Sequence, residues 1–343
     1  MTTSEVPQWL QTVNEKRLVR EKAIREFLDV HKTRFEFDIQ GFDSTLGYVS
    51  RSYKPAMQDC VLVSILKQLG AIIVAKSNLP QSIMWCETDN PLWGLTVHPK
   101  DPEFTPGGST GGEGTLLSLR GTVIGWGTDI GGSIRIPSHM NGLYGMKPSS
   151  TRTLHQECID IMDQYYTADG GEDIRRDVEA GGEPFIPHVE ALVNRGQPIS
   201  VYSYWQLNKQ KVAAQKRYLD LWKSTRSAAT GEEIDVLLTP VMPHSAVPHR
   251  KCRWVGYTKV FNFVDYPAVV IPAGQVSKEL DSEAASTMHV YQPRNPLDEW
   301  NWNLFDVKAM DGMPIGVQIV ARRLHEERAL GAAKAIDSIL RGV

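Results

Sequence analysis

GGSTGGEG (Gly107–Gly114) and GTDIGGSIRIP (Gly127–Pro137) are the two stretches that decide the fold of this chain. They lie in a segment of forty residues, from Pro106 to Gly145, that contains twelve glycines. Ile, Leu, Trp and Arg are interleaved with these glycines, which argues against a flexible linker. The segment therefore predicts tight turns and close backbone approaches.

Three interpretations of this segment follow from its residues alone. A phosphate-binding loop is disfavoured, because neither GxxxxGK[ST] nor GxGxxG occurs in a strand–loop–helix frame. A purely structural set of turns is the second interpretation. The third is a hydrolase site, because Ser133 follows Gly131-Gly132, where no side chain blocks the backbone N–H groups. Consecutive N–H groups beside a nucleophile can form an oxyanion hole.

The segment from Gly107 to Pro148 resembles the signature of the amidase signature family almost residue by residue. The resemblance implies that Ser133 is the nucleophile. It also implies that Ser109, twenty-four residues earlier and in a cis peptide, relays a proton between a neutral lysine and Ser133. A serine hydroxyl needs such a base to become nucleophilic.

The same resemblance assigns roles to neighbouring residues. The backbone N–H groups of Ile130, Gly131, Gly132 and Ser133 would hold the oxyanion. Asp129 and Arg135 would support the loop as an ion pair. Ile83 falls where the family lines its substrate pocket, although a plain core position explains a buried isoleucine equally well.

Five further segments resemble amidases, the last three of them fungal-type acetamidases, so the resemblance covers most of the chain. They are Gly41–Tyr48, Asn78–Trp93, Asp169–His188, Phe261–Pro272 and Pro314–Arg323. The implied fold is α/β, with a mixed twisted sheet flanked by helices. We expect one amidase-like domain over residues 1–343, with its signature core at 106–148.

Hydrophobic periodicity agrees with an α/β fold, because helical patterns alternate with short apolar runs. Helices are predicted at 7–30, 55–69, 113–119, 202–225 and 326–340. Strands are predicted at 71–75, 122–124, 234–239, 268–271 and 315–320.

The catalytic lysine of the family is missing from its expected place. It should lie seven residues before Gly41, where this chain has Arg34, and the apolar strand that should precede it is also absent. Arg34 cannot act as a base. Lys32 could replace the lysine only if the loop changes its conformation. Lys76 is interpreted as a structural residue, and Lys54 as a solvated one.

A second gap lies near 151–155, where the family has further strands and helices. The sequence thus indicates an amidase with two internal deletions, one before residue 35 and one near 151–155. Missing exons, a mispredicted gene model or a decaying paralogue would all give this pattern.

The composition and charge of the chain restrict the classes of partner and the location that can be expected for it. The net charge of −3 argues against a broad nucleic-acid surface, and no apolar run reaches the length of a membrane span. The start MTTSEVPQWL lacks the pattern of a secretory signal. Four cysteines without a CxxC pair suit a reduced, cytoplasmic protein. The sequence leaves a homodimer open.

No cofactor or metal is expected. His244, His249 and Cys252 match no standard zinc spacing. A Ser-His-Asp arrangement would need a histidine, but nothing marks His139 or His155 as a base. We therefore predict a cofactor-free amidohydrolase acting on small carboxylic amides. The alternative is an inactive amidase remnant that binds a ligand or a partner.

Overall fold

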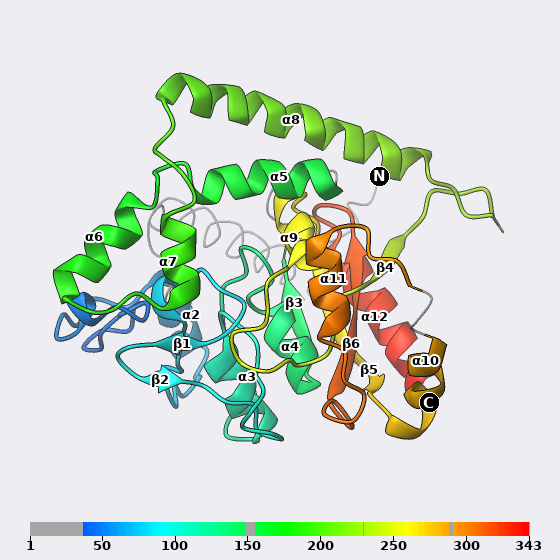
Figure 1. Cartoon of the computed structure of the whole chain (residues 1–343), viewed down its shortest axis with the longest axis horizontal. Coiled ribbons are helices and arrows are strands. Elements are labelled where there is room, and N and C mark those ends of the chain that lie inside the picture. The colour runs from blue at the N-terminus through cyan, green and yellow to red at the C-terminus, as the bar shows by residue number, and fades with distance from the viewer. Residues whose placement is uncertain (1–36, 149–154, 229, 288–290, 343) are drawn as a thin grey trace, which may run out of the picture. The chain divides into compact units, whose positions relative to one another are not determined.

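The computed structural model describes residues 37–148, 155–228, 230–287 and 291–342 (Figure 1). The chain divides into two compact units. Unit 1 comprises 1–46 and 51–75, and unit 2 comprises 47–50 and 76–343. The helix predicted at 7–30 and the residues Lys32 and Arg34 lie outside the described residues.

Unit 1 contains one helix among its described residues, α2 (Val61–Gln68). The prediction placed the start of this helix six residues too early. Pro55 and Ala56 form isolated bridges with Asp43 and Gln40, so this part of the chain is extended rather than helical. As predicted, a glycine follows the helix, and Gly70 adopts a φ of +82° that favours this residue type.

Unit 2 is built on a four-stranded sheet with the order β3-β5-β6-β4. The strands are β3 (Gly145–Lys147), β4 (Val236–Pro240), β5 (Ala268–Gln275) and β6 (Pro314–Ala321). Every neighbouring pair in this sheet is antiparallel, whereas the sequence predicted a mixed sheet. The α/β class itself is confirmed, because helices flank the sheet.

Alternate residues of β5 pack on opposite faces of the sheet, as the twofold period of a strand requires. Val269 and Ile271 pack with Ala329 and Ala333 of α12 (Glu326–Arg341). Val270 packs in a second cluster with residues of α4 (Arg135–Asn141). The sheet therefore separates α12 from α4, which lies near the end of the glycine-rich segment.

A second layer of helices covers the α4 side of the sheet. α5 (His155–Tyr166) contacts both α8 (Val201–Ser224) and α9 (Gly256–Phe263) through a buried apolar cluster. Figure 1 shows α5 and α8 running side by side. Among the described residues, no helix combines the length and the hydrophobicity that a transmembrane span requires.

The remaining elements are shorter. The helices are α3 (Gly111–Ser118), α6 (Glu172–Gly181), α7 (Pro187–Val193), α10 (Lys278–Thr287) and α11 (Pro296–Asn303). A two-stranded hairpin is formed by β1 (Asp89–Asn90) and β2 (Gly94–Leu95), and 3-10 turns occur at Val49–Arg51 and Gln81–Ile83.

Two predicted strands, 71–75 and 122–124, are not strands in the structure. Ile72 is 89% exposed and Val123 is 96% exposed, which is unusual for apolar residues with strand-forming patterns. A strand exists only where a neighbour pairs with its N–H and C=O groups. No described segment pairs with either run, so both remain as extended or turn-like chain.

Candidate functional site

The two glycine-rich loops meet beside Ser133. Ser133 lies two residues before α4, and Ser109 lies two residues before α3, with a cis peptide bond between Gly108 and Ser109. The N–H of Thr110 donates to the carbonyl of Ser133 over 3.1 Å. Both serines are buried, with exposed fractions of 2% for Ser109 and 8% for Ser133. The fold thus joins the two serine-bearing loops although they are distant in sequence.

Two glycines are required by this close approach. Gly132 has a φ of +131°, and a Cβ atom there would lie 2.3 Å from the hydroxyl of Thr258. A Cβ atom at Gly108 would lie 2.6 Å from the backbone nitrogen of Glu87. Any side chain at either position would push neighbouring backbone or side chains away from the loops.

Asp129 and Arg135 form a buried ion pair at the base of the Ser133 loop. Arg135 donates to the Asp129 carboxylate through Nε at 3.0 Å and through a terminal nitrogen at 2.9 Å. Asn262 of α9 donates to the same carboxylate at 2.8 Å. Burial alone would raise the pKa of Asp129, but the charge and hydrogen bonds of Arg135 outweigh it and hold that pKa at about 2.

The N–H groups of the loop are only partly available for an oxyanion. The N–H of Gly132 donates to Asp129 Oδ1 at 2.9 Å, so this expected donor is already engaged. Within the described part of the chain, the N–H groups of Ile130, Gly131 and Ser133 have no acceptor. Three of the four expected donors therefore remain available.

Two side chains from the covering helices orient these N–H groups. Tyr166 of α5 donates its hydroxyl to the carbonyl of Ile130 at 2.6 Å, and Thr258 of α9 donates to the carbonyl of Gly131 at 2.6 Å. The C=O and N–H of one trans peptide point in opposite directions. Holding the Ile130 carbonyl against Tyr166 therefore directs the Gly131 N–H away from that ring.

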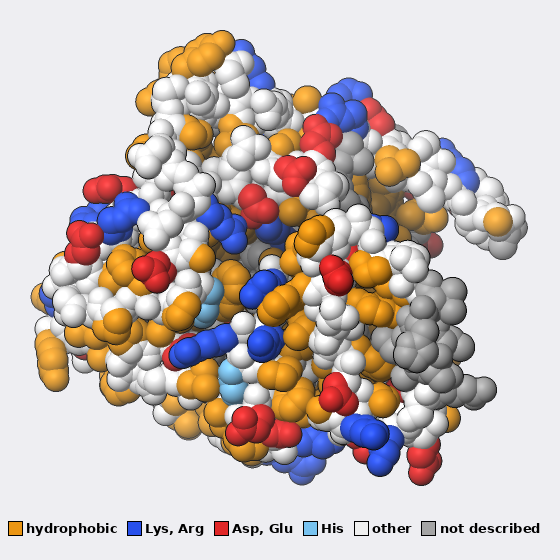
Figure 2. Space-filling view, viewed as in Figure 1, with side chains coloured by type: hydrophobic (Ala, Val, Ile, Leu, Met, Phe, Trp, Pro, Cys, Tyr) orange, Lys and Arg blue, Asp and Glu red, His pale blue; other side chains and the backbone are white. Residues whose placement is uncertain are grey.

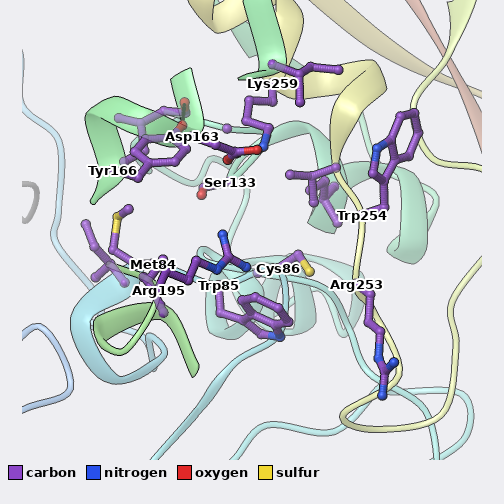
Figure 3. A pocket seen from close by; sticks show the side chains of 18 of the residues that line it. Met84, Trp85, Cys86, Ser133, Asp163, Tyr166, Arg195, Arg253, Trp254 and Lys259 are labelled. Carbon is purple, nitrogen blue, oxygen red and sulfur yellow. Dashed lines mark hydrogen bonds and ion pairs between the residues drawn. The ribbon is translucent and has the colours of Figure 1, made fainter. Parts of the chain in front are cut away.

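A cavity of about 300 Å³ opens in front of Ser133 (Figure 3). The predicted residues Ser133, Ile130, Gly131 and Ile83 line it, whereas Ser109 and Gly132 do not. The side chains of Trp85 and Trp254 form aromatic parts of the cavity wall. Small-molecule sites commonly have this size and an apolar wall with a few polar groups.

Several polar side chains of the pocket were missed by the sequence analysis. Lys259 of α9 lines the pocket and forms an ion pair with Asp163 of α5, with 2.6 Å between Nζ and Oδ1. Arg195, from the turn after α7, also reaches the cavity. These residues follow Ser133 by 30 to 126 positions, so no local spacing in the sequence could have linked them to it.

Neither of the two described lysines that the sequence pointed to, Lys54 and Lys76, lines the pocket. Lys54 is exposed in unit 1, and Lys76 is half-buried in unit 2 but does not line the cavity. Among the described residues that line the cavity, Lys259 is the one lysine and none is a histidine.

Three of the histidines considered from the sequence, His139, His244 and His249, have hydrogen-bond partners outside the cavity. His139 uses Nε2 toward the carbonyl of His244 at 2.9 Å, while its Nδ1 accepts from the N–H of Gly316 at 2.8 Å. His249 contacts the carbonyl of Pro102. No cluster of three or more His, Cys, Asp or Glu side chains suited to a metal occurs in the described parts of the chain.

The chain is similar to known proteins in sequence and in fold. The family model described as Amidase matches residues 36–168 and 168–330. "Amidase 1" of Gibberella moniliformis is 45% identical, with 89% of this chain and 78% of the relative covered. "Acetamidase" of Emericella nidulans is 28% identical, with coverages of 89% and 75%. A solved structure of "Fatty acid amide hydrolase" superposes with a TM-score of 0.77 at 20% identity, over 90% of this chain and 72% of that chain.

The alignment with "Amidase 1" extends over 412 positions, although the whole chain has only 343 residues. Many positions of the relative therefore have no counterpart here. The family model also matches in two segments. Both observations agree with the internal deletions that the sequence indicated.

Proposed function

Because the chain belongs to the amidase family and is an amide hydrolase, we propose that it cleaves small carboxylic amides through a covalent intermediate on Ser133. The observation that carries the proposal is the position of Ser133. It lies at the wall of the cavity, at the end of a loop whose N–H groups at Ile130, Gly131 and Ser133 are available. Asp129 and Arg135 hold that loop in place.

The proposed reaction is acyl transfer. Ser133 Oγ attacks the amide carbonyl while its proton leaves through Ser109. The developing negative charge on the carbonyl oxygen is stabilised by the available N–H groups. The C–N bond then breaks, the leaving nitrogen takes the proton, and ammonia or an amine departs. Water hydrolyses the ester on Ser133 and regenerates the free hydroxyl.

Proton transfer is the weak step of this mechanism. The lysine expected behind Ser109 is replaced by Arg34 in the sequence, and an arginine cannot serve as a base. Lys259 is in the cavity, but its ammonium group is bound by Asp163. A positioned general base contributes about 10²–10⁴ in rate, so we propose that the chain acts slowly.

The missing lysine also favours a second candidate function. In this alternative the chain is an inactive remnant that binds an amide-like ligand or a partner in the same cavity. The two functions differ in one property, since only the first requires Ser133 to react covalently.

We further propose that the protein is cytoplasmic and that its binding partner is a small amide. Residues 1–343 would form one amidase-like domain, and a homodimer is left open. All four cysteines are free thiols, which suits a reducing compartment. The net charge of −3 gives no reason to expect nucleic acid as a partner.

A fluorophosphonate probe tests the proposed function, because it reacts with activated serines. The unmodified chain should be labelled at Ser133, as mapped by peptide mass spectrometry, and Ser133→Ala should not be labelled. Ser138→Ala is the matched control, because Ser138 is a buried serine on α4 whose hydroxyl donates within its own helix to the carbonyl of Ile134. Ser109→Ala should weaken labelling without moving it. Labelling of Ser133→Ala, or of another residue, would exclude the assignment.

A further inference from the structure

Arg195 is a cation that the catalytic proposal does not use. It lies in the turn after α7, where its N–H donates to the carbonyl of Leu192 at 3.2 Å. Leu192 is buried and lines the cavity, and Arg175 donates to the carbonyl of Val193 at 3.0 Å. The backbone that carries Arg195 is therefore held in place. Figure 3 shows its side chain pointing from this turn into the cavity, on the side that faces Ser133.

The other charged groups of the cavity already have partners or point elsewhere. Lys259 and Asp163 form an ion pair with each other, and Asp160 accepts from Gln156 within α5. The guanidinium of Arg253 stacks on the ring of Trp300, with 3.3 Å between the carbon of the guanidinium and the ring centroid, and Figure 3 shows it directed away from the cavity.

In the described part of the chain, no carboxylate pairs with the guanidinium of Arg195. Figure 2 shows basic side chains beside a hollow between α5, α7 and α11, three of the helices that contribute lining residues. Among the described residues that line the cavity, Arg195 is thus an exposed cation without a carboxylate partner, on the side of the cavity that faces the proposed nucleophile.

From this arrangement we propose that the cavity selects amides that carry a free carboxylate, which Arg195 binds. A guanidinium has a planar set of donors that matches a carboxylate with two parallel hydrogen bonds. Ile83 and Trp85 also line the cavity, and their apolar side chains suit a short apolar spacer. The carboxylate can stand on the acyl side of the amide, as in glutaramate, or on the amine side, as in N-acetylglycine. The proposal rests on the proposed function, because it takes this cavity as the substrate site.

Equilibrium binding tests the proposal without requiring turnover. The full chain carrying Ser133→Ala is titrated with glutaramate and with glutaramide, which replaces the carboxylate by a neutral amide of nearly the same shape. Calorimetry or the fluorescence of Trp85 and Trp254 reports binding. N-acetylglycine and its amide form the second pair. Comparing the two pairs shows whether Arg195 binds a carboxylate on the acyl side or on the amine side of the amide.

The preference for the carboxylate should be about 10- to 100-fold in one of the two pairs, the range expected for hydrogen bonds to charged groups. Adding Arg195→Met should remove the preference while leaving the weak binding of the neutral ligand unchanged, and Arg195→Lys should retain part of it. Arg176→Met is the matched control, because Arg176 is an exposed arginine paired with Asp173 on α6.

Equal binding within both pairs, or a preference that survives Arg195→Met, would overturn the proposal. Absence of binding by all four ligands to a chain whose Ser133 reacts with the fluorophosphonate probe would also overturn it, while leaving the proposed function intact. A carboxylate preference that depends on Arg195, in a chain that the probe never labels, would support the proposal and refute the hydrolytic mechanism.

Discussion

Replacing Asp129 by alanine should lower the free energy of unfolding by about 3–5 kcal/mol, the cost of leaving a buried charge without its partner. The Asp129 carboxylate accepts six hydrogen bonds. Three come from the N–H groups of Gly132, Ile134 and Arg135, two from the Arg135 side chain and one from Asn262. The side chains of Asp129 and Arg135 are 1% and 0% exposed, so water cannot replace these contacts.

The loss comes mainly from Arg135, which would stay buried with neutral acceptors alone, the carbonyl of Thr258 and the side chains of Asn262 and Gln318. The folded pKa of Asp129, about 2, lies below its value of 3.8 in an unfolded chain. The contribution is therefore complete above pH 3.8 and is lost as the pH falls through 2. A measurement at pH 7 captures all of it.

Urea unfolding followed by tryptophan fluorescence at pH 7 measures the change. Asp173→Ala is the control, because Asp173 pairs with Arg176 at the surface, where the two side chains are 67% and 61% exposed. This control should leave the unfolding midpoint in place. Equal midpoints for Asp129→Ala and Asp173→Ala would refute the role of Asp129 as the support of the Ser133 loop.

The remaining predictions concern pH and metals. Burial raises the pKa of Glu87 from 4.5 to about 7, although the N–H groups of Arg250 and Cys252 donate to it. Since the folded pKa exceeds the unfolded one, the free energy of unfolding should fall by up to about 3 kcal/mol as the pH rises from 4.5 to 7. Glu87→Gln should flatten this pH dependence in urea unfolding at pH 5 and pH 8, and an unchanged dependence would contradict the interpretation. Any amide hydrolysis should survive prolonged treatment with EDTA, because the proposed chemistry uses serine alone. Loss of activity that zinc restores would overturn the serine mechanism.

The later part of the fold could be predicted closely from the sequence. The predicted helix at 202–225 is α8 (Val201–Ser224), the strand at 315–320 is β6 (Pro314–Ala321), and the helix at 326–340 is α12 (Glu326–Arg341). Each of these three segments has a clear hydrophobic pattern, and each packs or pairs with other described parts of the chain. The glycine-rich loops were equally clear, because their glycines are required by backbone approaches such as that of Gly132 to Thr258.

The rest could not be predicted, for two physical reasons. The runs at 71–75 and 122–124 have the composition of strands, but pairing is a property of the neighbour and not of the segment. The charged groups of the cavity come from elements that are distant in the sequence. Lys259 and Asp163 meet because α9 packs on α5, and no periodicity in the sequence reports that contact.

Release of ammonia from acetamide and benzamide tests the central claim most directly. Three forms are compared at equal concentration: the unmodified chain, Arg34→Lys, and a chain in which the missing lysine strand is restored, each with and without Ser133→Ala. The account predicts turnover by the restored form that disappears with Ser133→Ala, and rates at least about 10²-fold lower for the other two forms, because a positioned base contributes about 10²–10⁴. Turnover by the unmodified chain at about 1–10³ s⁻¹ would contradict the account and would direct attention to Lys32 as the base. Hydrolysis by the restored form that persists in Ser133→Ala would contradict it at the nucleophile itself.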